Sequence, residues 1–236
     1  DEFRKKTYQV EQPYRNSLMQ SVSRNPLYRS FMGVRYVIGD QAPLGYELAK
    51  SSEGVKIYRN TKVSPVAYAT NRYISRKEYD KLAFPYNQTA LAEYAVVEQG
   101  IGEQEAREAG QMAEGANEKE FAIPELKREY LKIKKNASGY HIEAGQAATI
   151  KVPISGLEGG ENILFLQFKV NNGRPNKDVA IWLEGVRNKL SSREHVYYNG
   201  NTTFTYTVEL AQGQQEASLK LGKGDYDITD ITCYGM

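Results

Sequence analysis

Several residue types on which functional sites often depend are scarce in this chain. Cys233 is the only cysteine, so the sequence has neither a disulfide framework nor a cysteine-based metal site. Its two histidines, His141 and His195, are not accompanied by a nucleophile elbow, a phosphate-binding glycine loop or a metalloprotease helix motif. We therefore predict no catalytic residue and no cofactor in this chain.

Long apolar stretches are also missing. The richest one spans residues 163–166 and is far shorter than the roughly 20 residues that cross a bilayer. The opening residues, Asp-Glu-Phe-Arg-Lys-Lys, contain neither the apolar segment of a signal peptide nor an initiating Met. We expect a soluble piece of a longer protein.

Charge is distributed unevenly along the 236 residues, although the net charge is only +2. Basic residues outnumber acidic ones by six in residues 1–97, and acidic residues outnumber basic ones by five in residues 98–122. The basic part is compatible with a position near anionic lipid or a polyanionic polymer, but an ordinary solvated surface is the main interpretation. Its basic residues are scattered and belong to no nucleic-acid-binding module, so no nucleic-acid partner is predicted.

Residues 98–122 form the clearest boundary in the chain. They are rich in Gly, Glu and Gln and hold few large apolar side chains, so burial cannot offset the entropy of ordering them. We predict an acidic linker or loop there. It separates a small α+β unit over residues 1–97 from a β-sandwich over residues 123–236.

The segment after the linker has the pattern of an antiparallel sandwich. Residues 202–210, TTFTYTVEL, alternate apolar and polar side chains with the period of a half-buried strand. The strand over residues 162–170 is apolar on both faces at its start, as a central strand would be. Gly- and Asn-rich turns separate the strand patterns. We predict a mainly β fold, an antiparallel jelly-roll-like β-sandwich, with the α+β unit packed on it.

The α+β unit shows weaker signals. Short strands are expected within GVRYVIGD, GVKIYRN and VAYATNRYI. Ser75 and Glu78 have the spacing of a capping box at a helix start, and Pro85 keeps that helix short. A second helix is expected over residues 88–97.

Aromatic side chains are candidates for carbohydrate binding, because their faces stack on sugar rings. Trp182, Tyr197 and Tyr198 are the residues that we consider, in a chain with 18 tyrosines and one tryptophan. Tyrosine is also favoured in strands for its fit to a half-buried pleated surface, and this structural role is the main alternative.

An Asp-Tyr-Asp pattern near the C-terminus is a candidate metal site. Asp225, Asp227 and the nearby Asp230 offer oxygen ligands of the kind that Mg²⁺, Mn²⁺ and Ca²⁺ prefer. The nucleotide-binding α/β fold in which such a pair serves glycosyl transfer is missing upstream. Aspartates on the outer face of a strand, with Tyr226 and Ile228 facing the core, are the alternative.

Residues 17–97 resemble the YfhO family of bacterial membrane proteins. The resemblance rests on the combination and order of SLMQSVSRNPLYRSFMGVRYVIGD, GYELAKSSEGVKIYRN, SPVAYATNRYISRKEYDKL and FPYNQTALAEYAVVE, and it continues more weakly through KVNNGRPNKDVAIWLEGVRNKLSS. It implies a multi-spanning glycosyltransferase-like membrane protein that uses lipid-phosphate-linked sugars and decorates Gram-positive cell-wall polymers such as teichoic acid. The catalytic acidic residue of such enzymes lies in an early extracytoplasmic loop, and none is carried over here.

Three functional hypotheses follow, and the resemblance implies the first of them. The first is a non-catalytic extracytoplasmic domain that sits over the transmembrane part of the same polypeptide at the cell membrane and helps to position an anionic glycopolymer or lipid-linked sugar. The second is an autonomous carbohydrate-binding β-sandwich module. The third, an enzyme complete within this chain, has the least support from the sequence.

Overall fold

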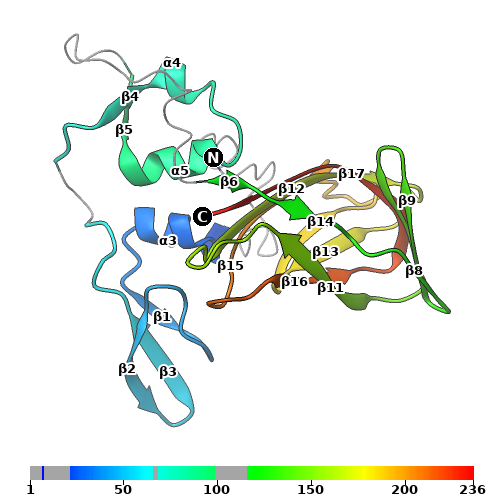
Figure 1. Ribbon diagram of the computed structural model, residues 1–236, viewed down its shortest axis with the longest axis horizontal. Helices are drawn as coiled ribbons and strands as arrows, with labels where there is room; N and C mark the ends of the chain where they lie inside the picture. The colour runs from blue at the N-terminus through cyan, green and yellow to red at the C-terminus, as the bar shows by residue number, and fades with distance from the viewer. Residues whose placement is uncertain (1–6, 8–21, 66–68, 99–115) are drawn as a thin grey trace. The chain divides into compact units, whose positions relative to one another are not determined.

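The computed structural model describes residues 7, 22–65, 69–98 and 116–236 (Figure 1). Two compact units result, one formed by Asp1–Arg24 with Asn117–Met236 and the other by Asn25–Ala116. Most of the predicted linker, residues 99–115, and the start of the VAYATNRYI strand, residues 66–68, lie outside the described residues. Among the described residues, no helix is both long and apolar enough to cross a membrane.

The larger unit contains two antiparallel sheets, which together form the sandwich. One has the strand order β15-β12-β17-β10-β9-β8, with β6 paired to β17, and the other has the order β14-β13-β16-β11-β7. The first sheet consists of β6 (Asn117–Glu118), β8 (Leu126–Arg128), β9 (Leu131–Asn136), β10 (Gly139–Ala144), β12 (Ile163–Asn172), β15 (Thr203–Glu209) and β17 (Gly224–Gly235). The second consists of β7 (Glu120–Phe121), β11 (Ala148–Ser155), β13 (Val179–Leu183), β14 (Val186–Leu190) and β16 (Glu216–Leu221). The predicted mainly β class and antiparallel sandwich are confirmed.

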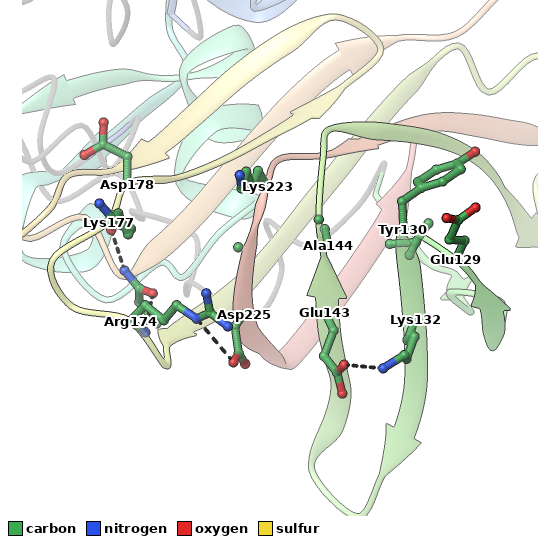
Figure 2. A pocket seen from close by; sticks show the side chains of 14 residues that line it. Glu129, Tyr130, Lys132, Glu143, Ala144, Arg174, Lys177, Asp178, Lys223 and Asp225 are labelled. Carbon is green, nitrogen blue, oxygen red and sulfur yellow. Dashed lines mark hydrogen bonds and ion pairs between the residues drawn. The ribbon is translucent and has the colours of Figure 1, made fainter.

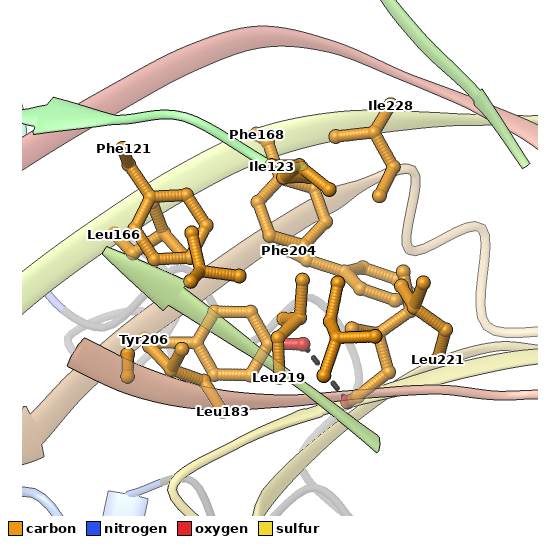
Figure 3. Packing of buried hydrophobic residues seen from close by; sticks show 14 of the residues in the cluster. Phe121, Ile123, Leu166, Phe168, Leu183, Phe204, Tyr206, Leu219, Leu221 and Ile228 are labelled. Carbon is orange, nitrogen blue, oxygen red and sulfur yellow. Dashed lines mark hydrogen bonds between the residues drawn. The ribbon is translucent and has the colours of Figure 1, made fainter. Parts of the chain in front are cut away.

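The core of the sandwich lies between the two sheets (Figure 3). Alternate residues of β11 are buried, as the period of two requires, and β12 is internal to its sheet and almost wholly buried. Tyr206 on β15 is 1% exposed, and its hydroxyl donates to the Ile181 carbonyl of β13 at 2.9 Å. This bond joins the two sheets and satisfies a polar group that would otherwise be costly to bury.

Strand β15 is more deeply buried than its alternating sequence predicts. Thr205 and Thr207, expected on a solvated face, are buried as well. The Thr205 hydroxyl accepts a hydrogen bond from Gln167, and its carbonyl accepts one from the buried Asn188 amide of β14. Hydroxyl groups with such partners can be buried at little cost, so the simple alternation understates the burial of this strand.

The described residues of the smaller unit form three helices and two small sheets. A cluster of buried residues, Ile74, Tyr79, Ala90, Leu91 and Tyr94, forms its core. One sheet is antiparallel with the order β1-β3-β2, and the other pairs β4 with β5 in parallel. The elements are α3 (Pro26–Phe31), β1 (Tyr36–Ile38), β2 (Glu47–Ser52), β3 (Val55–Arg59), β4 (Tyr73–Ser75), α4 (Arg76–Tyr79), α5 (Tyr86–Glu93) and β5 (Ala95–Val97).

The helix expectations for the smaller unit are partly wrong. Ser75 caps α4, since its hydroxyl accepts from the Glu78 amide at 3.2 Å, but the Glu78 carboxylate bonds Lys81 instead of reaching back. The second helix ends at Glu93, and residues 95–97 form a strand beside β4. Val96 and Val97 are β-branched and favour the extended conformation, which overrides the helical pattern.

A buried ion pair holds Lys119, the residue between β6 and β7, to the loop between β11 and β12. The side chains of Lys119 and Glu161 are 3% and 10% exposed, and their charged atoms lie 2.8 Å apart. Lys119 also donates to the Gly156 carbonyl at 2.6 Å, and Glu161 accepts from Asn117 and from the Glu158 amide. Burial raises the pKa of Glu161, but these hydrogen bonds and the Lys119 charge outweigh it and leave the pKa below its usual value.

Replacing Lys119 by methionine should be strongly destabilising. Lys119→Met leaves the Glu161 carboxylate buried without its cation, and we expect the free energy of unfolding to fall by about 3–5 kcal/mol. The double variant Lys119→Met/Glu161→Leu should regain most of this loss, because no charge is then left unpaired. Urea denaturation of the three proteins tests this, and a double variant no more stable than the single one contradicts it.

The same pair predicts a dependence of stability on pH. A carboxyl whose pKa is lowered by folding stabilises the folded state above its unfolded pKa of about 4.5, and this contribution is lost as the pH falls through the lower folded pKa. The unfolding free energy of the wild type, taken relative to that of the double variant, should therefore fall on acidification below about pH 4.5, because only the wild type contains Glu161. A difference that is constant over this range would rule the assignment out.

Candidate functional site

A hollow of the sandwich unit lies at one end, where four connections meet (Figure 2). It has a volume of about 620 Å³ and is called the end pocket below. Its walls come from the β8–β9 turn with the start of β9, the end of β10 with Gly145, the loop between β12 and β13, and the β16–β17 turn. The lining residues are Glu129, Tyr130, Leu131, Lys132, Glu143, Ala144, Gly145, Asn172, Arg174, Lys177, Asp178, Lys223, Gly224 and Asp225.

Backbone contacts fix these connections in place. The Gly145 amide donates to the Tyr130 carbonyl at 2.9 Å, and the Gly173 amide donates to the Asp225 carbonyl at 3.0 Å. Gly222 lies so close to Ala180 that a Cβ there would be 2.3 Å from the Ala180 carbonyl oxygen. Only glycine therefore allows the β16–β17 turn, which carries Lys223, to pack against β13.

Most carboxylates of the end pocket are already paired. Lys132 and Glu143, opposite each other on β9 and β10, are 2.8 Å apart. The hydrogen bond from Lys132, followed by its charge, lowers the pKa of Glu143. Asp178 accepts from the Ser192 amide at 2.7 Å and pairs with Lys189 at 2.6 Å.

Asp225 belongs to a second charged group on β10 and β17. It lies 3.6 Å from Arg174 and 3.7 Å from the Nε2 atom of His141. The Nδ1 atom of His141 lies 2.8 Å from Asp227, and Nε2 lies 3.8 Å from Glu143. A basic ring therefore sits among three carboxylates beside the pocket.

Two ammonium groups of the end pocket remain uncompensated. Within the described residues, the side chains of Lys177 and Lys223 make no hydrogen bond or ion pair, and Glu129 is the only lining carboxylate in the same condition. Figure 2 shows Lys177 and Arg174 on one side of the pocket and Tyr130 with Glu129 on the other. Tyr130 is 40% exposed. The pocket thus offers free cations and an open aromatic ring.

Of the aromatic residues proposed from the sequence, Trp182 lies apart from the other two. Trp182 is half-buried beside the turn between β13 and β14, whereas the loop that carries Tyr197 and Tyr198 leaves the opposite end of that hairpin. The Trp182 ring is covered by cationic groups of Arg187 and Lys220, at 5.4 and 4.8 Å from its centre. These three residues do not form one platform.

The two tyrosines lie near the end pocket. They are 50% and 37% exposed, and the Tyr197 ring contacts that of His195 with centres 5.9 Å apart. Tyr198 lines a small hollow of about 60 Å³, and Asn172 lines both this hollow and the end pocket. Tyr198 is therefore connected to the end pocket through Asn172.

The three candidate metal ligands are spread along β17. Asp225 and Asp227 share its outer face, and Tyr226 and Ile228 are buried, as the sequence alternative states. Asp230 has a φ of 51° and pairs with Lys169 at 2.8 Å, away from the other two. In the described part of the chain, no group of three His, Cys, Asp or Glu side chains has the arrangement of a metal site.

The pocket residues other than Asp225 were not identified from the sequence. Tyr130, Lys177 and Lys223 come from three separate connections, and only the strand register brings them together. The Gly222–Gly224 turn and the Asn-rich turn at residues 171–173 were visible as reversals. No pattern in the neighbouring sequence showed that these two turns lie at the same end of the sandwich.

The molecule thus contains an antiparallel β-sandwich with a charged pocket at one end. Residues 3–236 match the model of the family described as bacterial membrane protein YfhO. The chain belongs to this family. No curated protein matches it.

Solved structures show only remote similarity. The C-terminal CBM6 of LamC from Zobellia galactanivorans is 16% identical, with a TM-score of 0.32 over 50% of this chain and 98% of that one. The module CBM6cm-2 from Cellvibrio mixtus lichenase 5A, in complex with cellotriose, is 11% identical, with a TM-score of 0.28 over 46% of this chain and 89% of that one. A Bacillus thuringiensis Cry1Da tryptic core variant is 8% identical, with a TM-score of 0.28 over 86% of this chain and 30% of that one.

The pairing of Lys132 with Glu143 can be tested by titration. In Lys132→Met the Glu143 carboxyl loses its main stabilising partner, so its pKa should rise toward the usual value of 4.5. Lys134, which acts on Glu143 through charge alone, is the matched control, and Lys134→Met should raise this pKa less. NMR titration of the side-chain carboxyl measures both, and equal shifts would contradict the pairing.

Proposed function

We propose that the chain is a non-catalytic binding region of a bacterial membrane protein, and that its end pocket holds an anionic segment of a glycan. The observation that carries this proposal is the combination of two uncompensated ammonium groups, Lys177 and Lys223, with the open ring of Tyr130 in one pocket. Its volume of about 620 Å³ is that of a small-ligand site.

The chemistry of the lining residues matches such a ligand. Lysine ammonium groups bind phosphate and carboxylate oxygens through short charge-assisted hydrogen bonds. The Tyr130 ring offers an apolar face for a sugar and a hydroxyl for its polar edge. The carboxylates of Glu143, Asp178 and Asp225 already have cationic partners, so they repel an anion less than free ones would.

The family membership suggests where this binding would be used. The proposed parent is a multi-spanning glycosyltransferase-like protein, and this chain is its extracytoplasmic part. In this role the pocket would position a cell-surface polymer such as teichoic acid, or a lipid-linked sugar, for glycosylation elsewhere in the parent. No catalytic residue is proposed within the chain.

Calorimetric titration of the 236-residue chain with purified teichoic acid tests the pocket. We expect saturable binding, and Lys177→Ala/Lys223→Ala should weaken it by at least about tenfold, since each lost charge-assisted bond is equivalent to about 1.5 kcal/mol or more. Lys151→Ala is the matched control, because Lys151 is an exposed lysine on β11 outside the pocket. An equal loss of affinity in Lys151→Ala would show that net charge alone, and not the pocket, determines binding. Wild-type affinity in the double variant would refute the assignment.

An autonomous module for neutral glycans is the second candidate, and the exposed Tyr197 and Tyr198 favour it. It predicts saturable binding of a neutral polysaccharide such as dextran, lost in Tyr197→Ala/Tyr198→Ala and retained in the lysine variant.

Deletion of the region from the full-length membrane protein separates the roles in the cell. Loss of polymer glycosylation supports the positioning role, and unchanged glycosylation argues against it.

A further inference from the structure

The three-stranded sheet of the smaller unit has one face that no described element covers. Residues directly opposite in an antiparallel pair share a face, so Ile38, Ile57 and Lys50 lie together, as do Tyr36, Arg59 and Glu47. Val55, two residues before Ile57, points to the same side. This face, defined by Tyr36, Ile38, Val55 and Ile57, is called the apolar face below.

Three of the four side chains of the apolar face are open to solvent, and Ile57 is half-buried. Tyr36 is 56% exposed, Ile38 70% and Val55 48%. No residue of β1, β2 or β3 belongs to either buried cluster of the described residues. On the opposite side of the sheet Tyr58 is buried, and its hydroxyl bonds the Asp40 carbonyl at 3.1 Å. Leu48, which lies opposite Tyr58 on that side, is 56% exposed, so the two sides differ in Tyr58 and in the number of open apolar side chains.

Cations border this apolar face. Lys50 and Arg59 share it, and neither side chain has a hydrogen bond or ion pair with any described residue. Glu47 is the one carboxylate on the face, and it lies outside ion-pair distance of Arg59 in the described structure. The face is thus apolar at its centre with a net positive border, and its tyrosine belongs to the residue types favoured at the bilayer interface.

We propose that the apolar face of the β1-β3-β2 sheet binds the surface of an anionic lipid bilayer. Tyr36, Ile38 and Val55 enter the boundary between headgroups and acyl chains, and the long side chains of Lys50 and Arg59 reach back to anionic headgroups. A two-fold contact between copies would instead bring two positive faces together, which like charges disfavour. The membrane context of the family is consistent with a lipid partner.

Vesicle flotation of the 236-residue chain tests this proposal. Binding is expected to vesicles that contain phosphatidylglycerol and to be weak on phosphatidylcholine alone. Ile38→Asp/Val55→Asp should weaken it by at least about tenfold, because two apolar side chains no longer enter the bilayer. Val196→Asp is the matched control, since Val196 is an apolar side chain of the sandwich unit that is 89% exposed. Its binding should equal that of the wild type.

The charge border is tested separately. Lys50→Gln/Arg59→Gln should weaken binding to phosphatidylglycerol vesicles by roughly thirty-fold, since each basic residue near an anionic surface contributes about a factor of five. Lys134→Gln/Lys151→Gln, which removes two exposed lysines of the sandwich unit, is the control for net charge. Equal binding to both vesicle types, or equal loss in the control, overturns the proposal.

A cysteine probe gives a measurement that needs no disruptive change. Cys233 is 3% exposed and burial raises its pKa to about 12, so its thiol reacts poorly with labels. Ile38→Cys with an environment-sensitive dye should shift to an apolar emission on phosphatidylglycerol vesicles, and labelled Val196→Cys should not. A dye at position 38 that stays in water, or a dimer in light scattering that Ile38→Asp/Val55→Asp abolishes, contradicts lipid binding.

Discussion

Burial of one face of each large sheet against the other is the constraint on which the sandwich unit depends. Inward residues of β12, β15 and β17 meet those of β11, β13 and β16, and the Tyr206–Ile181 bond joins the two layers. This packing fixes the register of every strand, since a shift by one residue would turn the apolar side chains outward. The register in turn decides which turns meet at each end, and so builds the end pocket.

The strands of the sandwich were predictable because all three of their signals are local. The alternation in TTFTYTVEL, the apolar run of β12 and the Gly- and Asn-rich reversals each lie within about ten residues. In the smaller unit β2 has no such alternation, as its six residues are all exposed, and it was missed. Residues 95–97 took strand form because β4 supplies a partner, which a helical pattern read alone cannot show.

The end pocket shows why the site was harder to predict than the fold. Tyr130, Lys177 and Lys223 lie in different turns, and each resembles an ordinary solvated residue until the register is known. Asp225 was proposed as a metal ligand from its spacing to Asp227, but in the structure Asp225 lies beside Arg174 and Asp227 beside the His141 ring. The spacing of a motif indicates which side chains share a strand face, but it does not indicate which side chains neighbouring strands place beside them.

Charge pairing gives the pocket a preference for anions that the formal charge of its lining residues does not show. Its lining holds four basic side chains and four acidic ones, so the formal charge is balanced. Three of the acids are paired with Lys132, Lys189 and Arg174, and one of these cations, Lys189, comes from outside the lining.

The basic excess that remains is carried by Lys177 and Lys223, which have no partner among the described residues. An anion gains two charge-assisted contacts there without displacing an existing ion pair, whereas a cation finds only Glu129 free. Selectivity for an anion therefore comes from which charges are already paired, not from their number.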